Sequence, residues 1–433
     1  MFNKQQRLMT KIFQEKIQRY LSSYENEFSL PEYKFICDCV LGILKSRSVI
    51  INRIGMKLGE KISLKKSCER LYRNVRNQHL GEKLRLNIQK RQSRQIDQET
   101  LIIIDESDIV KSRANRMEGL KRVRDGSEQC FRLGYDLLNI IAVKPEEEGY
   151  RILPLSSDLI AQNLEQDSMS QILEDRLTEI TIHTGNKGTY LFDRGYDSRK
   201  LISYLKSNNN AFVIRSTGKR GLMIDEQEQP FLDTVKQMEL NTLISGIKPG
   251  SYFDCGIKRV SMRTDPHRKK YPEMVELLLV VARYKPNRNG KAGYFYFLCD
   301  FPEQNLTEKE IITRVIHSYR QRWKIEELHR QIKQDYKWEQ IQLMSYTGLK
   351  NMNLLLLLSM CFLYSLQQMV IKICKVFPHI MKYSNRRWKQ IYNFIYYRLA
   401  LVLESSLAHT TRYKVIKFKW PKKDTEQLLI EGI

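Results

Sequence analysis

Four polar residues toward the end of the chain stand at a spacing that could support chemistry on phosphate. Tyr319, Arg322, Glu326 and Lys333 follow the pattern Y-x2-R-x3-E-x6-K in SYRQRWKIEELHRQIK. With about 3.6 residues per turn, a helix places these four side chains within about 60° of one another, on one face. The carboxylate can bind a divalent cation, and the cationic side chains can hold phosphate. The alternative is a solvent-exposed helix face with salt bridges.

Two aspartates in the first half of the chain could complete a metal site with Glu326. Asp105 ends the aliphatic run LIIID and Asp193 ends YLFD, and both runs have the pattern of buried strands. Ligands of α/β sheets gather beyond the carboxyl ends of strands, so the two acids can meet there, although either one alone could simply cap its strand. Three carboxylates suit Mg2+ or Mn2+, and two such ions can activate an attacking hydroxyl and stabilise the leaving oxygen. We therefore expect two ions at these three acids. Three acids close to these in sequence are less favourably placed as metal ligands: Asp108, Asp197 and Glu327.

The charge of the chain indicates a polyanionic partner. Its 433 residues carry a formal net charge of +24, which favours nucleic acid, and less often an acidic membrane surface, over a small metabolite. Residues 61–94 contain eleven Lys or Arg and two acids, and no acid lies between Glu339 and Glu404. A helix in the first of these stretches would suit a DNA groove, with its cations on phosphates, unless it is a basic solvated helix without a partner. Its predicted DNA contacts are Lys65, Lys66, Arg70 and Arg73.

The hydrophobic patterns predict an α/β protein with helical ends. Strand patterns alternate with helical patterns in the middle of the chain, as in a layered α/β sheet, and a β-rich stretch follows. A long helical pattern over 307–338 carries Glu326. The expected regions are a helical DNA-binding domain at 1–95, a catalytic domain at 96–215 and 302–375, a β-rich insertion at 216–301 and a helical basic region at 376–433.

Two further features bear on where the protein acts. The eight cysteines are scattered among mostly apolar neighbours, as in a reduced cytosolic protein, and no export signal is visible at the start of the chain. Residues 351–371 form an uncharged run about long enough to span a bilayer, but the run contains Asn, Ser and Gln. We expect a buried core helix there, with membrane insertion as the alternative.

The order Asp105, Asp193 in DRGYD, then Tyr319, Arg322, Glu326 and Lys333 resembles a known family. It is similar to the bacterial insertion-sequence transposases that cut and paste DNA with a DDE triad and carry a Y-R-E-K signature. The resemblance covers roughly residues 45–375. It implies a ribonuclease H-like catalytic domain, a mixed sheet flanked by helices, that a β-rich insertion interrupts between the second Asp and the Glu. Residues 216–301 fit that insertion in place and character.

The resemblance also implies roles for single residues. The three acids would hold the metal ions, and Tyr319, Arg322 and Lys333 would hold phosphates near the cleaved DNA end. Relatives that pass through a DNA hairpin hold a flipped base with a Trp of the insertion, but the insertion here has none. The best substitute is an aromatic residue of the strand YFYFLCD, which could equally be a core residue. The remaining expected DNA contacts are Arg215, Tyr296 and Arg330.

The implied activity is cut-and-paste DNA transposition in the cytoplasm of a bacterium, close to the nucleoid. The chain would bind double-stranded DNA at terminal inverted repeats and cleave it via a hairpin intermediate. It would then join the DNA to a target as a homodimer, without a membrane. Three alternatives stay open: a metal-dependent nuclease of the same fold without strand transfer, an inactive DNA-binding repressor, and a basic membrane-associated protein.

Overall fold

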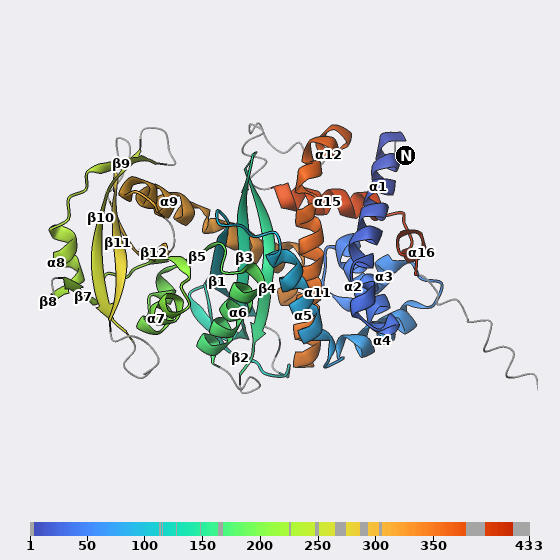
Figure 1. The fold of residues 1–433 in the computed structure, drawn as a ribbon. Coiled ribbons are helices and arrows are strands. Elements are labelled where there is room, and N and C mark those ends of the chain that lie inside the picture. Colours follow the sequence, from blue (N-terminus) through green and yellow to red (C-terminus); the bar gives the residue numbers. More distant parts are fainter. Residues whose placement is uncertain are drawn as a thin grey trace, which may run out of the picture. The chain divides into compact units, whose positions relative to one another are not determined.

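The computed structural model describes most of the chain, which forms two compact units (Figure 1). Residues 4–418 are described, except for 112–113, 115, 127, 148, 163–167, 225–226, 247–250, 265–273, 286–292, 303–304 and 378–394. Unit 1 comprises Met1–Leu80, Gln334–Gln342 and Leu358–Ile433, and unit 2 comprises Gly81–Lys333 and Leu343–Leu357.

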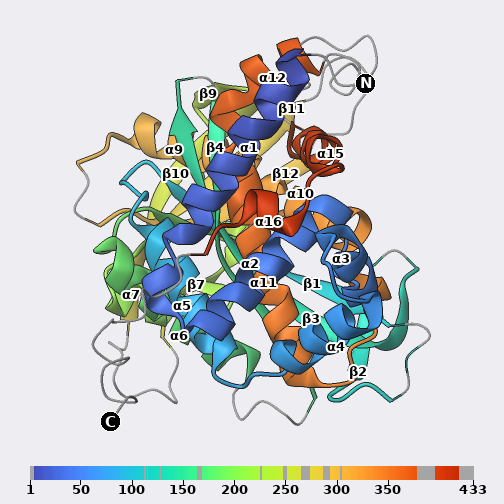
Figure 2. The ribbon, with the colours of Figure 1, turned by 90° about the vertical axis from the view of Figure 1, so that its right-hand side faces the viewer.

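Unit 1 is helical and draws on both ends of the chain. α15 packs against α1 and α2, and α16 packs against α1, as Figure 2 shows. The regions expected at 1–95 and 376–433 thus both contribute to one unit, although 378–394 and 419–433 lie outside the described residues. The elements are α1 (Lys4–Ser22), η1 (Glu25–Glu27), α2 (Leu30–Ser46), α3 (Ile51–Leu58), α4 (Leu64–Val75), η4 (Trp338–Gln340), η5 (Gln367–Met369), α12 (Val370–Val376), α15 (Ile395–Leu407) and α16 (Arg412–Val415).

A cluster of charged side chains inside unit 1 ties α2 to α4 and α16. Asp38 on α2 is fully buried and accepts hydrogen bonds from Arg70, at 2.7 Å, and from Arg412. Glu60 accepts from the same two guanidinium groups, at 2.8 Å from Arg70 Nη2 and 3.4 Å from Arg412 Nη1. Arg70, expected as a DNA contact, therefore lies in an internal ion-pair network.

This network predicts a large loss of stability when Asp38 is removed. Asp38→Ala leaves two partly buried guanidinium groups with one carboxylate, so we expect the free energy of unfolding to fall by about 3 kcal/mol. Urea unfolding of the full chain measures this difference. The control is Glu69→Ala, an exposed acid on α4 that should change it by less than about 0.5 kcal/mol. Equal midpoints for the two variants would show that the buried network does not stabilise the unit.

Unit 2 contains one mixed sheet flanked by helices, as predicted. β1 is parallel to β5 and β5 is parallel to β6, whereas β3 is antiparallel to β1. The strand order is β2-β3-β1-β5-β6-β12-β11-β10-β7-β8, with β4 paired to β3 and β9 to β10. The first strands are β1 (Leu101–Val110), β2 (Lys121–Asp125), β3 (Cys130–Glu146), β4 (Gly149–Ile160), β5 (Thr189–Phe192) and β6 (Ala211–Arg215).

The β-rich segment expected as an insertion extends the same sheet. β12 pairs antiparallel with β6, from Phe297↔Arg215 to Asp300↔Phe212, so the segment is continuous with the strands that precede it. Its elements are β7 (Gly221–Ile224), β8 (Gln227–Pro230), α8 (Phe231–Lys236), β9 (Thr242–Ser245), β10 (Tyr252–Arg263), β11 (Met274–Lys285) and β12 (Gly293–Asp300).

Helices cover both faces of the first strands. Ile102 and Ile104 of β1 share a hydrophobic core with Leu177 of α6 and Ile202 of α7, which places those helices on one face. α10 contacts β1 and β3, and Arg322, the residue directly before α10, donates to Asp105. Asp105 alternates with Ile104 along β1 and so faces the other side of the sheet. The helices are α5 (Leu80–Ser93), α6 (Met169–Thr184), α7 (Arg199–Ser207), α9 (Glu308–Gln321) and α10 (Trp323–Arg330), with the short turns η2 (Arg194–Tyr196) and η3 (Gln331–Asp335).

The apolar run near residue 351 lies in α11 (Tyr346–Ser365). The segment Tyr346–Met369 has a mean hydropathy of 1.4 and is long and apolar enough to cross a membrane. However, 89% of its most apolar window is buried within the protein, which is the pattern of a core helix.

Candidate active site

Asp105 lies within a strand and not at its end, which corrects the expectation from sequence. β1 continues to Val110 because its antiparallel partner β3 is long, and the pairing runs from Leu101↔Val143 to Val110↔Gly134. The parallel pairing with β5 stops earlier, at Ile103↔Leu191. Asp105 therefore follows the last paired position of β1 and β5, where its side chain is only partly buried.

Asp193 follows β5 directly, where the sequence pattern places it. It is the residue before the short turn η2, and its side chain is about half-buried. Since β1 and β5 are parallel neighbours, Asp105 and Asp193 lie at the same edge of the sheet.

The long helix expected over 307–338 is interrupted at the site. α9 ends at Gln321 and α10 begins at Trp323, with Arg322 between them. The N–H of Arg322 donates to Tyr319 O at 3.2 Å and the N–H of Ile325 donates to Arg322 O at 3.2 Å, so the chain tightens to i→i−3 bonds at this point. A π-helical turn, η3, then changes the direction of the side chains around Lys333.

The guanidinium of Arg322 contacts all three predicted metal ligands. Its Nη1 lies 3.2 Å from Asp105 Oδ2 and 4.0 Å from Asp193 Oδ2, and its Nη2 pairs with Glu326 Oε1. Three acids that are far apart in sequence thus converge on one cation. The three acids surround Arg322, but their carboxylate oxygens do not all lie within 4.8 Å of one another.

A second arginine supports Asp193 through Tyr319. The Arg215 Nη1 donates to the Tyr319 hydroxyl at 2.8 Å, and that hydroxyl donates to Asp193 Oδ1 at 3.0 Å. Arg215 Nη1 also lies 3.8 Å from the same carboxylate oxygen. Tyr319 and Arg215, expected as DNA contacts, therefore lie beside the triad.

The other expected DNA contacts lie in different surroundings. Lys333 pairs with Asp108 at 3.1 Å, so this neighbouring acid, ranked below Asp105, belongs to the margin of the site. Tyr296 packs edge-on against Phe231, with ring centroids 5.3 Å apart, next to the hydrophobic core. Arg330 is exposed on α10, and three exposed cations lie on α4 of unit 1: Lys65, Lys66 and Arg73.

The surroundings of Asp105 and Asp193 shift the pKa values of the two carboxyl groups in opposite directions. Burial raises the pKa of Asp105 to about 6, although Arg322 acts against this rise. Burial also raises the pKa of Asp193, but hydrogen bonds from the Arg194 N–H and from Tyr319, with the charge of Arg322, outweigh it and leave the pKa lowered. The cations thus hold Asp193 ionised, whereas Asp105 remains sensitive to pH.

His329 is a residue of the site that sequence reasoning missed. Burial and the nearby cations Lys333 and Arg322 lower its pKa to about 3, so the imidazole is neutral. Its Nε2 is buried and finds no hydrogen-bond partner among the described residues. The sequence spacing could have identified His329, because it lies three positions after Glu326 and so on the same face of the helix, one turn further along.

The donor set fits a hard divalent cation. Three carboxylates that already neutralise one guanidinium offer the oxygen ligands that a hard divalent ion prefers. A buried amide without a partner also stands next to this set, at Asn139, and is taken up below.

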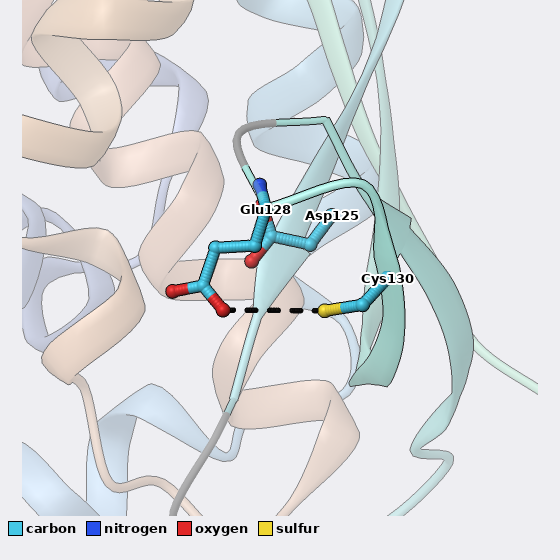
Figure 3. A group of neighbouring side chains, drawn as sticks. All are labelled: Asp125, Glu128 and Cys130. Atoms are coloured by element: carbon cyan, nitrogen blue, oxygen red, sulfur yellow. Dashed lines mark hydrogen bonds between the residues drawn. The ribbon is translucent and has the colours of Figure 1, made fainter.

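A different group of ligand atoms lies elsewhere in unit 2. Among the described residues, Asp125, Glu128 and Cys130 form the one group of three whose ligand atoms are within 4.8 Å of one another (Figure 3). Arg132 pairs with Asp125 at 3.5 Å and also with Glu128, and the Glu128 N–H donates to Asp125 Oδ1 at 3.2 Å. These contacts account for the cluster as a hairpin turn held by Arg132.

The pKa of Asp105 predicts how stability depends on pH without metal. The folded value of about 6 lies above the ordinary 3.8, so the folded protein holds a proton that the unfolded chain releases in this range. This contribution is complete below about pH 4 and is lost, by about 2–3 kcal/mol, as the pH rises through about 6. Urea unfolding in EDTA should show this loss relative to Asp105→Asn, and a difference that does not vary with pH would contradict it.

Residues 164–362 match the family model of the transposase DDE domain. The matched range contains Asp193, Tyr319, Arg322, Glu326 and Lys333, whereas Asp105 precedes it. The solved cryo-EM structure of a piggyBac transposase synaptic complex with hairpin DNA is also similar, at 12% identity and a TM-score of 0.36, over 95% of this chain and 84% of that chain. A comparison with curated proteins gives no match.

Proposed function

We propose, from the DDE transposase domain that residues 164–362 carry, that this chain is the DNA transposase of a bacterial insertion sequence. It would bind terminal inverted repeats, cleave a DNA strand and join the freed end to target DNA. The observation that carries this proposal is the convergence of Asp105, Asp193 and Glu326 on the Arg322 guanidinium.

Asp105, Asp193 and Glu326 would hold Mg2+ or Mn2+, with two ions as the expected number. When bound, these ions supply activation of the attacking oxygen and neutralisation of the leaving oxygen. Arg322 and Arg215 would turn from carboxylates to phosphate oxygens as DNA enters, because a guanidinium matches both kinds of acceptor with the same fork of donors. The Tyr319 hydroxyl, which donates to Asp193 Oδ1, would keep that carboxylate oriented during this exchange.

Recognition of the DNA ends would fall to basic side chains outside the triad. Lys65, Lys66 and Arg73 are exposed on α4, and Arg330 is exposed on α10. Together with the net charge of +24, they favour double-stranded DNA over a membrane surface. Joining two ends requires two active sites, so we expect a homodimer on DNA in the bacterial cytoplasm.

A hairpin intermediate remains a specific part of the proposal. Tyr294 is 47% exposed and stacks on Tyr296 with ring centroids 6.3 Å apart, so the pair could support an unstacked base. Tyr296 alone is a poorer platform because its ring packs against Phe231.

A supercoiled plasmid that carries the ends of the element tests the function. With Mg2+ or Mn2+, the purified chain should excise the element and insert it with a short target duplication, and denaturing gels should reveal hairpin ends. Nicking without insertion would instead indicate a nuclease of the same fold. Binding without cleavage, unaffected by Glu326→Ala, would indicate an inactive repressor.

A further inference from the structure

Asn139 of β3 is a buried amide with no hydrogen-bond partner among the described residues. It is fully buried, and neither its Oδ1 nor its Nδ2 finds a donor or acceptor there. Buried polar side chains are nearly always paired, because an unpaired amide keeps the full cost of leaving water. An amide that bears this desolvation cost in the free protein could gain its hydrogen-bond partner in another state, such as a ligand-bound one.

Asn139 lies directly opposite Asp105 in the sheet. The register pairs Asp105 with Asn139 across β1 and β3, so their side chains share one face with Cβ atoms about 5 Å apart. Their neighbours Ile104 and Ile140 belong to the hydrophobic core on the other face. The amide therefore shares with Asp105 the face from which Arg322 approaches.

In the free protein, other donors already occupy the Asp105 carboxylate, and the Asn139 amide is not among them. Asp105 Oδ1 accepts from the Glu106 N–H at 3.1 Å, and Oδ2 accepts from Arg322 at 3.2 Å. If Arg322 leaves for a phosphate, Asp105 loses its strongest donor, and its carboxylate must be held in a new orientation. An amide donor lies directly across the strand pair from Asp105, at Asn139.

We propose that Asn139 is a positioning residue that donates a hydrogen bond from its Nδ2 to the Asp105 carboxylate when that carboxylate binds a divalent cation. This inference rests on the proposed function, because it takes Asp105 as a metal ligand. Groups that hydrogen-bond to metal ligands typically change metal affinity by about 10–100-fold when they are removed. Asn139 would thus be unpaired in the free protein and paired in the metal-bound protein.

Asn139→Leu in the full chain separates this role from a structural one. Titration with Mn2+ alone, followed by calorimetry, should show affinity reduced by about tenfold or more. The unfolding temperature in EDTA should stay the same or rise, because the substitution removes an unpaired amide and leaves an apolar side chain of similar volume. Unchanged Mn2+ affinity would overturn the proposal, and so would a lowered unfolding temperature in EDTA.

Two matched variants complete the experiment. Asn353→Leu removes a buried amide that donates to Ser157 O at 3.0 Å and Ser157 Oγ at 2.9 Å, so it should lower the unfolding temperature without changing Mn2+ affinity. Asp105→Asn should weaken Mn2+ binding strongly. If it does and Asn139→Leu does not, this inference alone fails. If Asp105→Asn leaves Mn2+ binding unchanged, the proposed metal site fails with it.

Discussion

Replacement of any one of the three converging acids should abolish DNA strand cleavage for practical purposes. Asp105→Ala, Asp193→Ala and Glu326→Ala each remove a carboxylate from a site that stabilises charge on reacting oxygens, which contributes several kcal/mol to the rate. We expect the cleavage rate at the element's ends to fall about 1000-fold or more. Binding to the same DNA should stay within about twofold, because the substitutions remove negative charge and no phosphate contact.

The control for this prediction is an acid of the same helical region that does not face the site. Glu308 is exposed in the first turn of α9, so Glu308→Ala should leave the cleavage rate unchanged. Rates come from single-turnover cleavage of a labelled end in Mg2+, and affinities from gel shifts in Ca2+. If a variant of one of the three acids cleaves as fast as Glu308→Ala, that acid is not part of the catalytic site.

Arg322→Met should destabilise the metal-free protein and make its stability depend on divalent cations. Without the guanidinium, Asp105 loses its ion-pair partner, and Asp193 keeps only Arg215 among the cations of the described residues. We expect the free energy of unfolding at neutral pH to fall by about 2 kcal/mol in EDTA, a discounted value because Glu326 is largely exposed. Mg2+ should restore most of the loss, because binding to the folded state stabilises it.

Arg330→Met is the matched control, since Arg330 is exposed at the end of α10, the helix that follows Arg322. Its unfolding in EDTA should resemble that of the unmodified chain, and Mg2+ should stabilise both to the same small extent. If Arg322→Met is as stable as this control in EDTA, the negative charge of the three carboxylates does not need Arg322 to stabilise it.

Part of the site's geometry was predictable because it depends on residue types at helical and strand spacings. Asp193 follows its strand as the pattern predicts, and Arg322 and Glu326 meet at the expected i,i+4 spacing. The mixed sheet with flanking helices was also predictable, since alternating strand and helix patterns favour it. That the β-rich segment joins the same sheet was not, because strand pairing between β12 and β6 leaves no local signal.

The errors arise where tertiary pairing overrides local pattern. β1 continues past Asp105 because β3 supplies backbone partners as far as Gly134, which no single-strand pattern reveals. The π turn after α10 moves Lys333 toward Asp108, so a stripe calculated for an ideal helix does not place it at the triad. The pairing of Arg70 with buried Asp38 was also not predictable, because the two residues are 32 positions apart in sequence.

The position of the bound metal decides most directly whether the three acids form one catalytic site. Crystals of the DNA-bound protein grown with Mn2+ would locate the ions by anomalous scattering. We predict density bounded by the carboxylates of Asp105, Asp193 and Glu326, with Arg322 withdrawn from at least one of them. The opposite result is manganese bound only at Asp125, Glu128 and Cys130, or no manganese close enough to be bound by the three acids. Either finding would contradict this site and the strand-transfer chemistry assigned to it.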